Sequence, residues 1–208
     1  MAEVFNNILL QGIRGGKIPA RTAAAREWYR DQAKEITRTQ RNRTQGDRLI
    51  RELRQDSTRQ QDSRFRMGNM YLFAYDPKHK DTLPYYDRFP LIFPINKAKG
   101  GFLGINMHYL PPILRAKLMD QLYTISSNTQ FNETTRLRLS YEKLNSAAKF
   151  REFKPTVKHY LNSQVRTKPA YINPTEWDIA LFLPTQKFVG ATANKVYADS
   201  RRIIRANR

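Results

Sequence analysis

The sequence predicts an α+β protein in which a small antiparallel β-barrel, SH3-like in size, carries flanking helices and an extended basic N-terminal arm. Short aromatic segments separated by glycine and proline lie between residues 70 and 109, a pattern typical of short, strongly bent antiparallel strands. Segments with helical character follow them. The first 68 residues hold 15 basic residues but only four of the 24 aromatic residues, so the composition changes sharply near residues 66–68.

This change divides the chain into a basic helical or extended arm, residues 1–68, and an α+β body with a basic C-terminal tail, residues 69–208. Within the arm, residues 20–36 are alanine-rich, follow a proline and carry opposite charges at helical spacing, which predicts a helix. Its apolar stripe is too thin to fold alone, so we expect Trp28 and Tyr29 to dock on a partner. Residues 37–66 are rich in Arg, Gln, Thr and Ser, which indicates disorder in isolation.

The body begins with three predicted strands. Residues 70–75 alternate in the manner of a strand, and the polar loop 76–81 follows them. Residues 89–95 form a second strand that prolines flank and interrupt, which predicts an edge or a bulge. Gly100 and Gly101 then predict a tight hairpin turn into a third strand over residues 102–109.

Helical segments are predicted after the third strand. Two prolines end that strand and open a helix over residues 113–123. Residues 139–150 form a further helix, and residues 195–208 form a basic helix or a frayed tail. Residues 177–183, WDIALFL, are predicted as a strand that closes the sheet.

The charge of the chain indicates a polyanionic partner. Lys and Arg number 37 against 18 Asp and Glu, for a formal net charge of +19. Such a field attracts polyanions such as nucleic acid, anionic lipid or an acidic protein surface, and we favour nucleic acid or an acidic assembly partner. The chain has no cysteine, which excludes disulfides and thiolate metal sites. No apolar run approaches the roughly 20 residues that span a bilayer, and the first residues make a poor signal peptide, so no membrane partner is expected.

No catalytic constellation is evident, so we predict a non-enzymatic protein without cofactor, metal or small-molecule substrate. The three histidines, His79, His108 and His159, lack metal-ligand spacing, and His108 on its strand fits a hydrogen-bonded structural histidine. Asp76 and Asp87 allow a metal-dependent nuclease as a minor hypothesis. The stronger interpretation is a turn residue at Asp76 and an ion pair of Asp87 with Arg88.

Binding is therefore the expected activity. Arginines in or beside the weakly folding part of the arm, and others in the basic tail, suit contacts to phosphate without base recognition, or contacts to a protein partner. These candidate residues are Arg38, Arg41, Arg43, Arg48, Arg51 and Arg54 in the arm and Arg201, Arg202 and Arg205 in the tail.

Aromatic residues of the first strand offer a second, weaker candidate surface. Tyr71, Phe73 and Tyr75 fall on one face, near Lys78 and Lys80, and aromatic rings among cations can stack on bases. Residues in this pattern are more often part of a hydrophobic core, and we favour the core.

The string DPKHKDTLPYYDRFPLIFPI at residues 76–95, followed by GGFLGINMHYLPPILRAKLMDQL at residues 100–122, resembles small virion proteins of T4-like contractile-tailed bacteriophages, and the resemblance covers mainly residues 68–123. Weaker similarity lies at residues 149–155 and 176–184. The resemblance implies a structural virion component that is assembled in the host cytoplasm with other phage structural proteins as partners. Two alternatives stay open: a DNA end protector or head-completion protein at the double-stranded genome terminus, or a baseplate or neck tail subunit without DNA contact.

Overall fold

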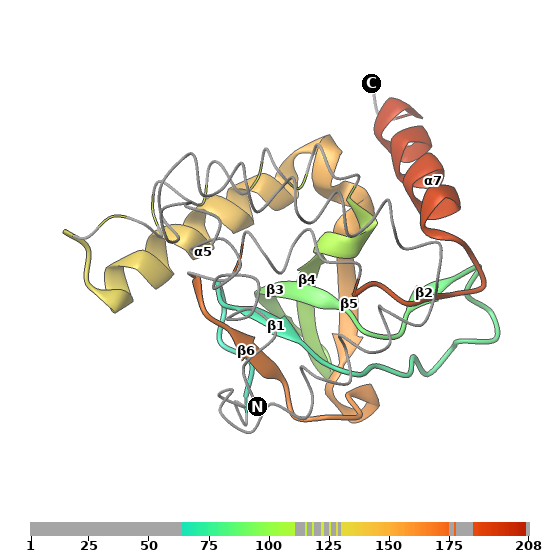
Figure 1. Ribbon diagram of the computed structural model, residues 1–208, viewed down its shortest axis with the longest axis horizontal. Coiled ribbons are helices and arrows are strands. Elements are labelled where there is room, and N and C mark those ends of the chain that lie inside the picture. The colour runs from blue at the N-terminus through green and yellow to red at the C-terminus, as the bar shows by residue number, and fades with distance from the viewer. Residues whose placement is uncertain are drawn as a thin grey trace, which may run out of the picture.

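The computed structural model describes residues 64–110, 130–174 and 185–206, with single positions at 115, 118, 122, 125, 128 and 177. This part of the chain is a mixed α+β structure (Figure 1). Its strands are β1 (Met70–Leu72), β2 (Tyr86–Asp87), β3 (Leu91–Ala98), β4 (Gly101–Asn106), β5 (Val157–Leu161), β6 (Ala170–Ile172) and β7 (Phe188–Val189). Its helices are η1 (Met107–Tyr109), α5 (Glu133–Lys149), η2 (Arg151–Thr156), η3 (Asn162–Gln164) and α7 (Ala193–Ala206), η marking 3₁₀ helices.

The main sheet has five strands in the order β5-β4-β3-β1-β6, and all its pairings are antiparallel. A second sheet pairs β2 with β7. An isolated bridge joins Tyr75, beyond β1, to Val165, beyond β5. This bridge continues the β1–β6 pairing. The four residues from Leu161 at the end of β5 to Val165 span at most about 14 Å, whereas the β5 and β6 edges of a flat five-stranded sheet would lie about 19 Å apart, so the sheet curls. The described residues nevertheless form no closed barrel, and the SH3-like part of the expectation stays a prediction.

Both faces of this sheet are buried. Along β1, Met70 and Leu72 enter one hydrophobic cluster, whereas Tyr71 and Phe73 enter another. Successive side chains of a strand point to opposite faces, so the two clusters lie on opposite sides of the sheet. Burial on both faces explains why the apolar run of β3 is nearly continuous instead of alternating.

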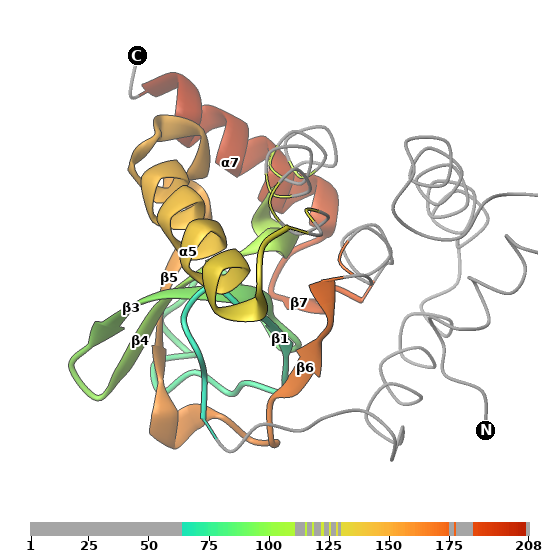
Figure 2. The same ribbon diagram turned by 90° about the vertical axis from the view of Figure 1, so that its left-hand side faces the viewer.

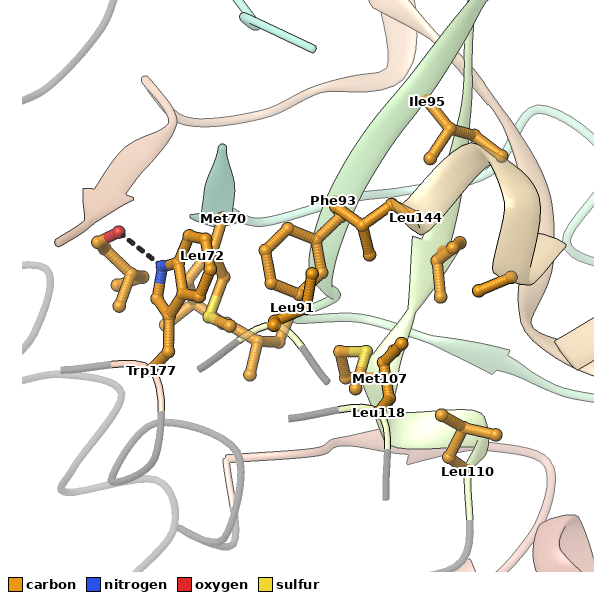
Figure 3. Close-up of a cluster of buried hydrophobic side chains, with 14 residues drawn as sticks. Met70, Leu72, Leu91, Phe93, Ile95, Met107, Leu110, Leu118, Leu144 and Trp177 are labelled. Atoms are coloured by element: carbon orange, nitrogen blue, oxygen red, sulfur yellow. Dashed lines mark hydrogen bonds between the residues drawn. The ribbon is translucent and has the colours of Figure 1, made fainter. Parts of the chain in front are cut away.

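The first cluster packs the sheet against helical segments (Figure 3). Phe93 of β3 meets Trp177 edge-on, with ring centroids 5.0 Å apart, and the Trp177 Nε1–H donates to the carbonyl of Ile172 at 3.0 Å. Leu118 and Leu144 reach the same cluster from two helical segments. Burial of so many large apolar side chains makes this cluster the main source of stability.

The second cluster is mostly aromatic and lies inside the curl of the sheet. Its rings pack edge to face, with Tyr75 and Tyr160 centroids 5.0 Å apart. Phe65 closes it from the N-terminal side, 4.3 Å from the Phe102 ring. The prediction that Tyr71, Phe73 and Tyr75 are core residues is confirmed, since each is at most 7 % exposed.

The hairpin between β3 and β4 depends on two glycines. Ala98 pairs with Gly101, so the turn consists of Lys99 and Gly100, and Gly100 has a φ of +72°. Gly101 has no such dihedral need, but a Cβ there would overlap the Tyr160 carbonyl on β5. The predicted hairpin is confirmed, one residue earlier than expected. The predicted bulge is confirmed as well, because the register shifts between Pro94 and Asn96.

Helix α5 lies across one face of the sheet, and α7 stands beside the C-terminal end of α5 (Figures 1 and 2). Asn132 caps α5 by accepting a hydrogen bond from the Thr135 N–H at 2.8 Å. The helices predicted over residues 139–150 and 195–208 are confirmed, although α5 begins six residues earlier than expected.

The strand predicted over residues 177–183 is wrong at Trp177, which is helical, while residues 178–183 lie outside the described residues. Trp177 contributes its indole to the core, so its apolar character reflects burial and not a strand; β6 occupies the sheet edge instead. The helix predicted over residues 20–36 lies outside the described residues, and so does most of the arm that the predicted division at residue 68 defines. No described helix is both long and apolar enough to cross a membrane.

Candidate nucleic-acid interface

Helix α7 presents the basic residues that the sequence singled out in the tail. Arg201, Arg202 and Arg205 are all exposed. At 3.6 residues per turn they share the side of α7 opposite Val196 and Ser200, which are buried. The sequence ANKVYADSRRIIRA therefore folds as an amphipathic helix with one face on the body and a cationic face in solvent.

Specific polar contacts hold α7 in place. The Ser200 hydroxyl donates to the carbonyl of Tyr109 at 3.0 Å, which ties the helix to η1. Arg115, only 3 % exposed, donates from its Nε to the Leu110 carbonyl at 2.7 Å and from a terminal nitrogen to the Tyr197 hydroxyl at 2.5 Å. These hydrogen bonds fix the helix on the body and so set the direction in which its outer side points.

The arginines of α7 differ in their local partners. Arg202 lies 3.6 Å from the Asp199 carboxylate, which also pairs with Lys195 at 3.2 Å. Within the part of the chain that the structure describes, Arg201 and Arg205 form no ion pair with a carboxylate. Among the described residues these two guanidinium groups are thus open to an external anion, and the Arg202 side chain of the Asp199 pair is itself largely exposed.

Further basic residues lie next to α7. Helix η2 packs against α7, and the end of α5 leads directly into η2. Lys149, the last residue of α5, and Lys154 of η2 are exposed. Two adjacent elements thus add cations beside the α7 arginines, and together they define a basic region that we call the α7–η2 surface.

A buried polar network lies beneath this surface. His108 Nδ1 donates to Asp87 Oδ2 at 2.6 Å, and His108 Nε2 lies 3.0 Å from the hydroxyl of Thr185. The Asn106 amide donates to the same Asp87 oxygen at 3.1 Å and to the Tyr160 hydroxyl at 3.0 Å. The network joins β2, β4, η1, β5 and the segment before β7.

The Asp87 carboxylate is fully satisfied by donors. Its other oxygen accepts the backbone N–H groups of Phe89 and Lys187 at 3.1 and 3.2 Å. Burial raises the pKa of Asp87, but the charge and hydrogen bond of His108 and the other donors outweigh it and hold that pKa below its usual value. For His108, burial lowers the pKa more than Asp87 raises it.

The order carboxylate, imidazole, hydroxyl is the order of an activated nucleophile. Here the hydroxyl belongs to Thr185, which is 2 % exposed, and His108 has no exposed surface. A substrate has no path to the hydroxyl, so the geometry fits a structural network. The prediction of a hydrogen-bonded structural histidine is confirmed.

The expected ion pair of Asp87 with Arg88 is wrong. Asp87 points into the protein and binds the buried donors, while Arg88 is exposed. Asp76 instead pairs with Lys80 at 3.2 Å and with Arg166 at 3.6 Å. The described residues contain no group of three or more acidic or histidine side chains that could hold a metal ion.

The structure thus brings together the three candidate arginines of the tail. The arm arginines and the docking pair Trp28 and Tyr29 lie outside the described residues. Sequence reasoning missed the buried Arg115 and the extent of the Asp87 network. The alternation of Asn106 and His108 at the end of a strand is the signal that could have revealed the network, because both polar side chains fall on one face.

The fold and the site define an α+β protein with a fixed cationic surface. Comparison with protein families identifies it further: the model of the phage T4 terminal DNA protecting protein matches residues 20–205, so the chain belongs to that family. The description of the family is that of a terminal DNA-protecting protein. No curated protein matches the chain, and no solved structure does. The resemblance to T4-like phage proteins is confirmed, in favour of the DNA end protector.

Proposed function

We propose that this chain is a non-enzymatic structural protein of a tailed-phage virion that binds the ends of the linear double-stranded genome and shields them from exonucleases. The observation that carries the proposal is the outer face of α7, where Arg201 and Arg205 are exposed and unpaired among the described residues. Membership of the DNA protecting family supplies the class of ligand.

The α7–η2 surface suits a DNA backbone. Guanidinium groups bind phosphate oxygens in a bidentate manner and carry their charge at any physiological pH. Contacts of this kind position a protein on DNA without reading its sequence. A protein that protects genome ends needs affinity of this sequence-independent type, and the net charge of +19 extends the attraction beyond the contact surface.

The arm has a complementary role in this proposal. Its six candidate arginines, from Arg38 to Arg54, would order on DNA or on neighbouring virion proteins, and the curled-sheet body would dock beside them. Other phage structural proteins are the expected partners, with assembly in the host cytoplasm. The alternative of a baseplate or neck subunit without DNA contact draws no support from the family match.

The test is protection of DNA ends by the purified full-length protein. A linear duplex is incubated with the protein and then with a double-strand-specific exonuclease, and the surviving full-length DNA is measured at increasing salt. Protection is expected at low salt and should fade as salt rises, since the logarithm of affinity falls with a slope of about −0.9 per neutralised phosphate. Digestion at the protein-free rate at every salt concentration would overturn the proposal.

A second measurement addresses the arm. Limited proteolysis of the free protein should cleave within residues 37–66, and bound linear DNA or assembly into the virion should slow that cleavage. Equal cleavage rates in the free and bound states would contradict an arm that orders on its partner.

A further inference from the structure

Phe150 stands out on the surface of the protein. Its side chain is 61 % exposed, whereas the other aromatic side chains that the structure describes are buried or half-buried. A single exposed apolar side chain is common and by itself needs no explanation. The informative feature of Phe150 is its place in the fold and the chemistry around it.

The backbone at Phe150 is fixed. Phe150 is the C-cap of α5, and its N–H donates to the carbonyl of Ala147 at 2.9 Å. Its carbonyl accepts the N–H of Phe153 at 3.0 Å. Phe153 packs on the main hydrophobic cluster, so the turn anchors one phenyl ring in the core and directs the other outward.

Phe150 lies within the α7–η2 surface. The exposed Lys149 precedes it, and the exposed Lys154 follows in η2. Helix α7, with its outward arginines, stands beside this end of α5 in both views of the structure (Figures 1 and 2). An exposed aromatic ring between two exposed lysines in the sequence, beside a helix with an arginine-rich outer side, suits a combination of phosphate contacts and base stacking.

A DNA end differs from internal duplex in one chemical respect that a phenyl ring can sense. Inside a duplex both faces of each base pair are covered, whereas the terminal pair exposes one flat aromatic face. Phosphate contacts cannot distinguish these cases, because the backbone charge is the same in both. We propose that Phe150 stacks on the terminal base pair while the basic groups around it hold the flanking phosphates, so that this residue supplies the preference for ends. The inference rests on the proposed function.

The test compares two DNAs with the full-length protein. One is a short blunt-ended duplex, and the other has the same duplex sequence closed by a hairpin loop at each end, so that no terminal pair is exposed. The wild-type protein should bind the open duplex more tightly than the closed one. Equal binding to both, or binding to neither, would overturn the proposed function together with the stacking role.

Variants then separate stacking from general DNA binding. Phe150→Ala should weaken binding to the open duplex by about 5- to 150-fold, down to no less than the affinity for the closed duplex, and leave binding to the closed duplex unchanged. Phe150→Trp should restore the preference. Leu83→Ala, which truncates another exposed apolar side chain, 43 % exposed, is the matched control and should change neither affinity.

A Phe150→Ala variant that keeps the wild-type preference, or that loses affinity for both DNAs equally, would overturn the stacking role and leave the proposed function standing. A fluorescent base analogue reports the contact directly. 2-Aminopurine at the terminal position should be quenched by the wild-type protein and not by Phe150→Ala, and the same analogue at the centre of the duplex should respond to neither. Quenching at the centre, or equal quenching by both proteins at the end, would contradict stacking by Phe150.

Discussion

The Nδ1 atom of His108 lies 2.6 Å from Oδ2 of Asp87, and both side chains are buried. The pair connects β2 to the end of β4, and Thr185 extends it toward β7. Strand β2 is two residues long and pairs with β7 alone, so few backbone bonds hold this corner of the body. The polar network therefore adds buried side-chain links between the β2–β7 sheet and the main sheet, beside the backbone hydrogen bond from the Tyr75 N–H to the Arg88 carbonyl at 2.9 Å and the packing of Phe188 on Tyr109.

Asp87→Asn should lower the free energy of unfolding by about 1.5–3 kcal/mol, because hydrogen bonds to a buried carboxylate are lost and some of their donors then face an amide N–H group. Chemical denaturation measures the effect. The matched control is Asp76→Asn, which breaks the exposed pairs with Lys80 and Arg166 and should cost less than about 1 kcal/mol. Similar losses for the two variants would show that the network is not a major stabilising feature.

Stability should fall as the solution is acidified. The pKa of His108 in the fold lies below its ordinary 6.5, and that of Asp87 below its ordinary 3.8. The unfolded chain thus binds more protons at both positions, so the stabilisation is complete above pH 6.5 and declines first below 6.5 and again below 3.8. Denaturation at pH 7.5 and pH 5.5 measures the first step. His108→Gln should reduce the loss of stability between these two pH values. An equal loss in the wild-type protein and the variant would show that protonation of His108 is not its cause.

The sequence predicted the sheet well where its signals were local. The paired glycines located the hairpin at residue 100, and the prolines of residues 90–94 located the bulge. Strand ends were less accurate, because β1 stops at Leu72 although the alternating pattern runs to Tyr75. Tyr75 retains the burial of the pattern and forms only a single bridge, to Val165. Side-chain alternation reports burial, whereas strand length depends on a partner that is 90 residues away.

The candidate site was only partly predictable for a related reason. Arg201, Arg202 and Arg205 form a local cluster of charge that any helix would display on one side. Asp87, His108 and Thr185 are far apart in sequence, and His108 joins the other two only in the folded chain, so the pair of Asp87 with Arg88 was the natural and wrong expectation. The strand predicted at Trp177 was wrong for a different reason, because a strongly apolar segment is compatible with a buried helix as well as with a strand.

Gly101→Ala should destabilise the protein although Gly101 has an ordinary backbone conformation. A Cβ at this position would overlap the carbonyl of Tyr160 on β5, so β4 and β5 would have to separate. Overpacking of this kind costs about 1–3 kcal/mol, which thermal or chemical unfolding resolves. Gly100→Ala distinguishes steric overlap from backbone strain. Its Cβ would meet only Leu161, at 3.6 Å, so any loss of stability in this variant arises from the φ of +72°. An unchanged stability of Gly101→Ala would show that the two strands can part freely.

Replacing Arg201, Arg202 and Arg205 together by Gln should weaken binding to linear duplex DNA by about tenfold to a hundredfold at low salt, from three exposed charge contacts of up to about 1 kcal/mol each. The salt dependence should become shallower by about one for each arginine that contacts a phosphate. The matched control, Lys78, Lys97 and Lys99 to Gln, removes the same charge from exposed positions on the loop after β1 and on the β3–β4 hairpin. If both triple variants reduced affinity and salt slope equally, net charge and not the α7 surface would account for binding.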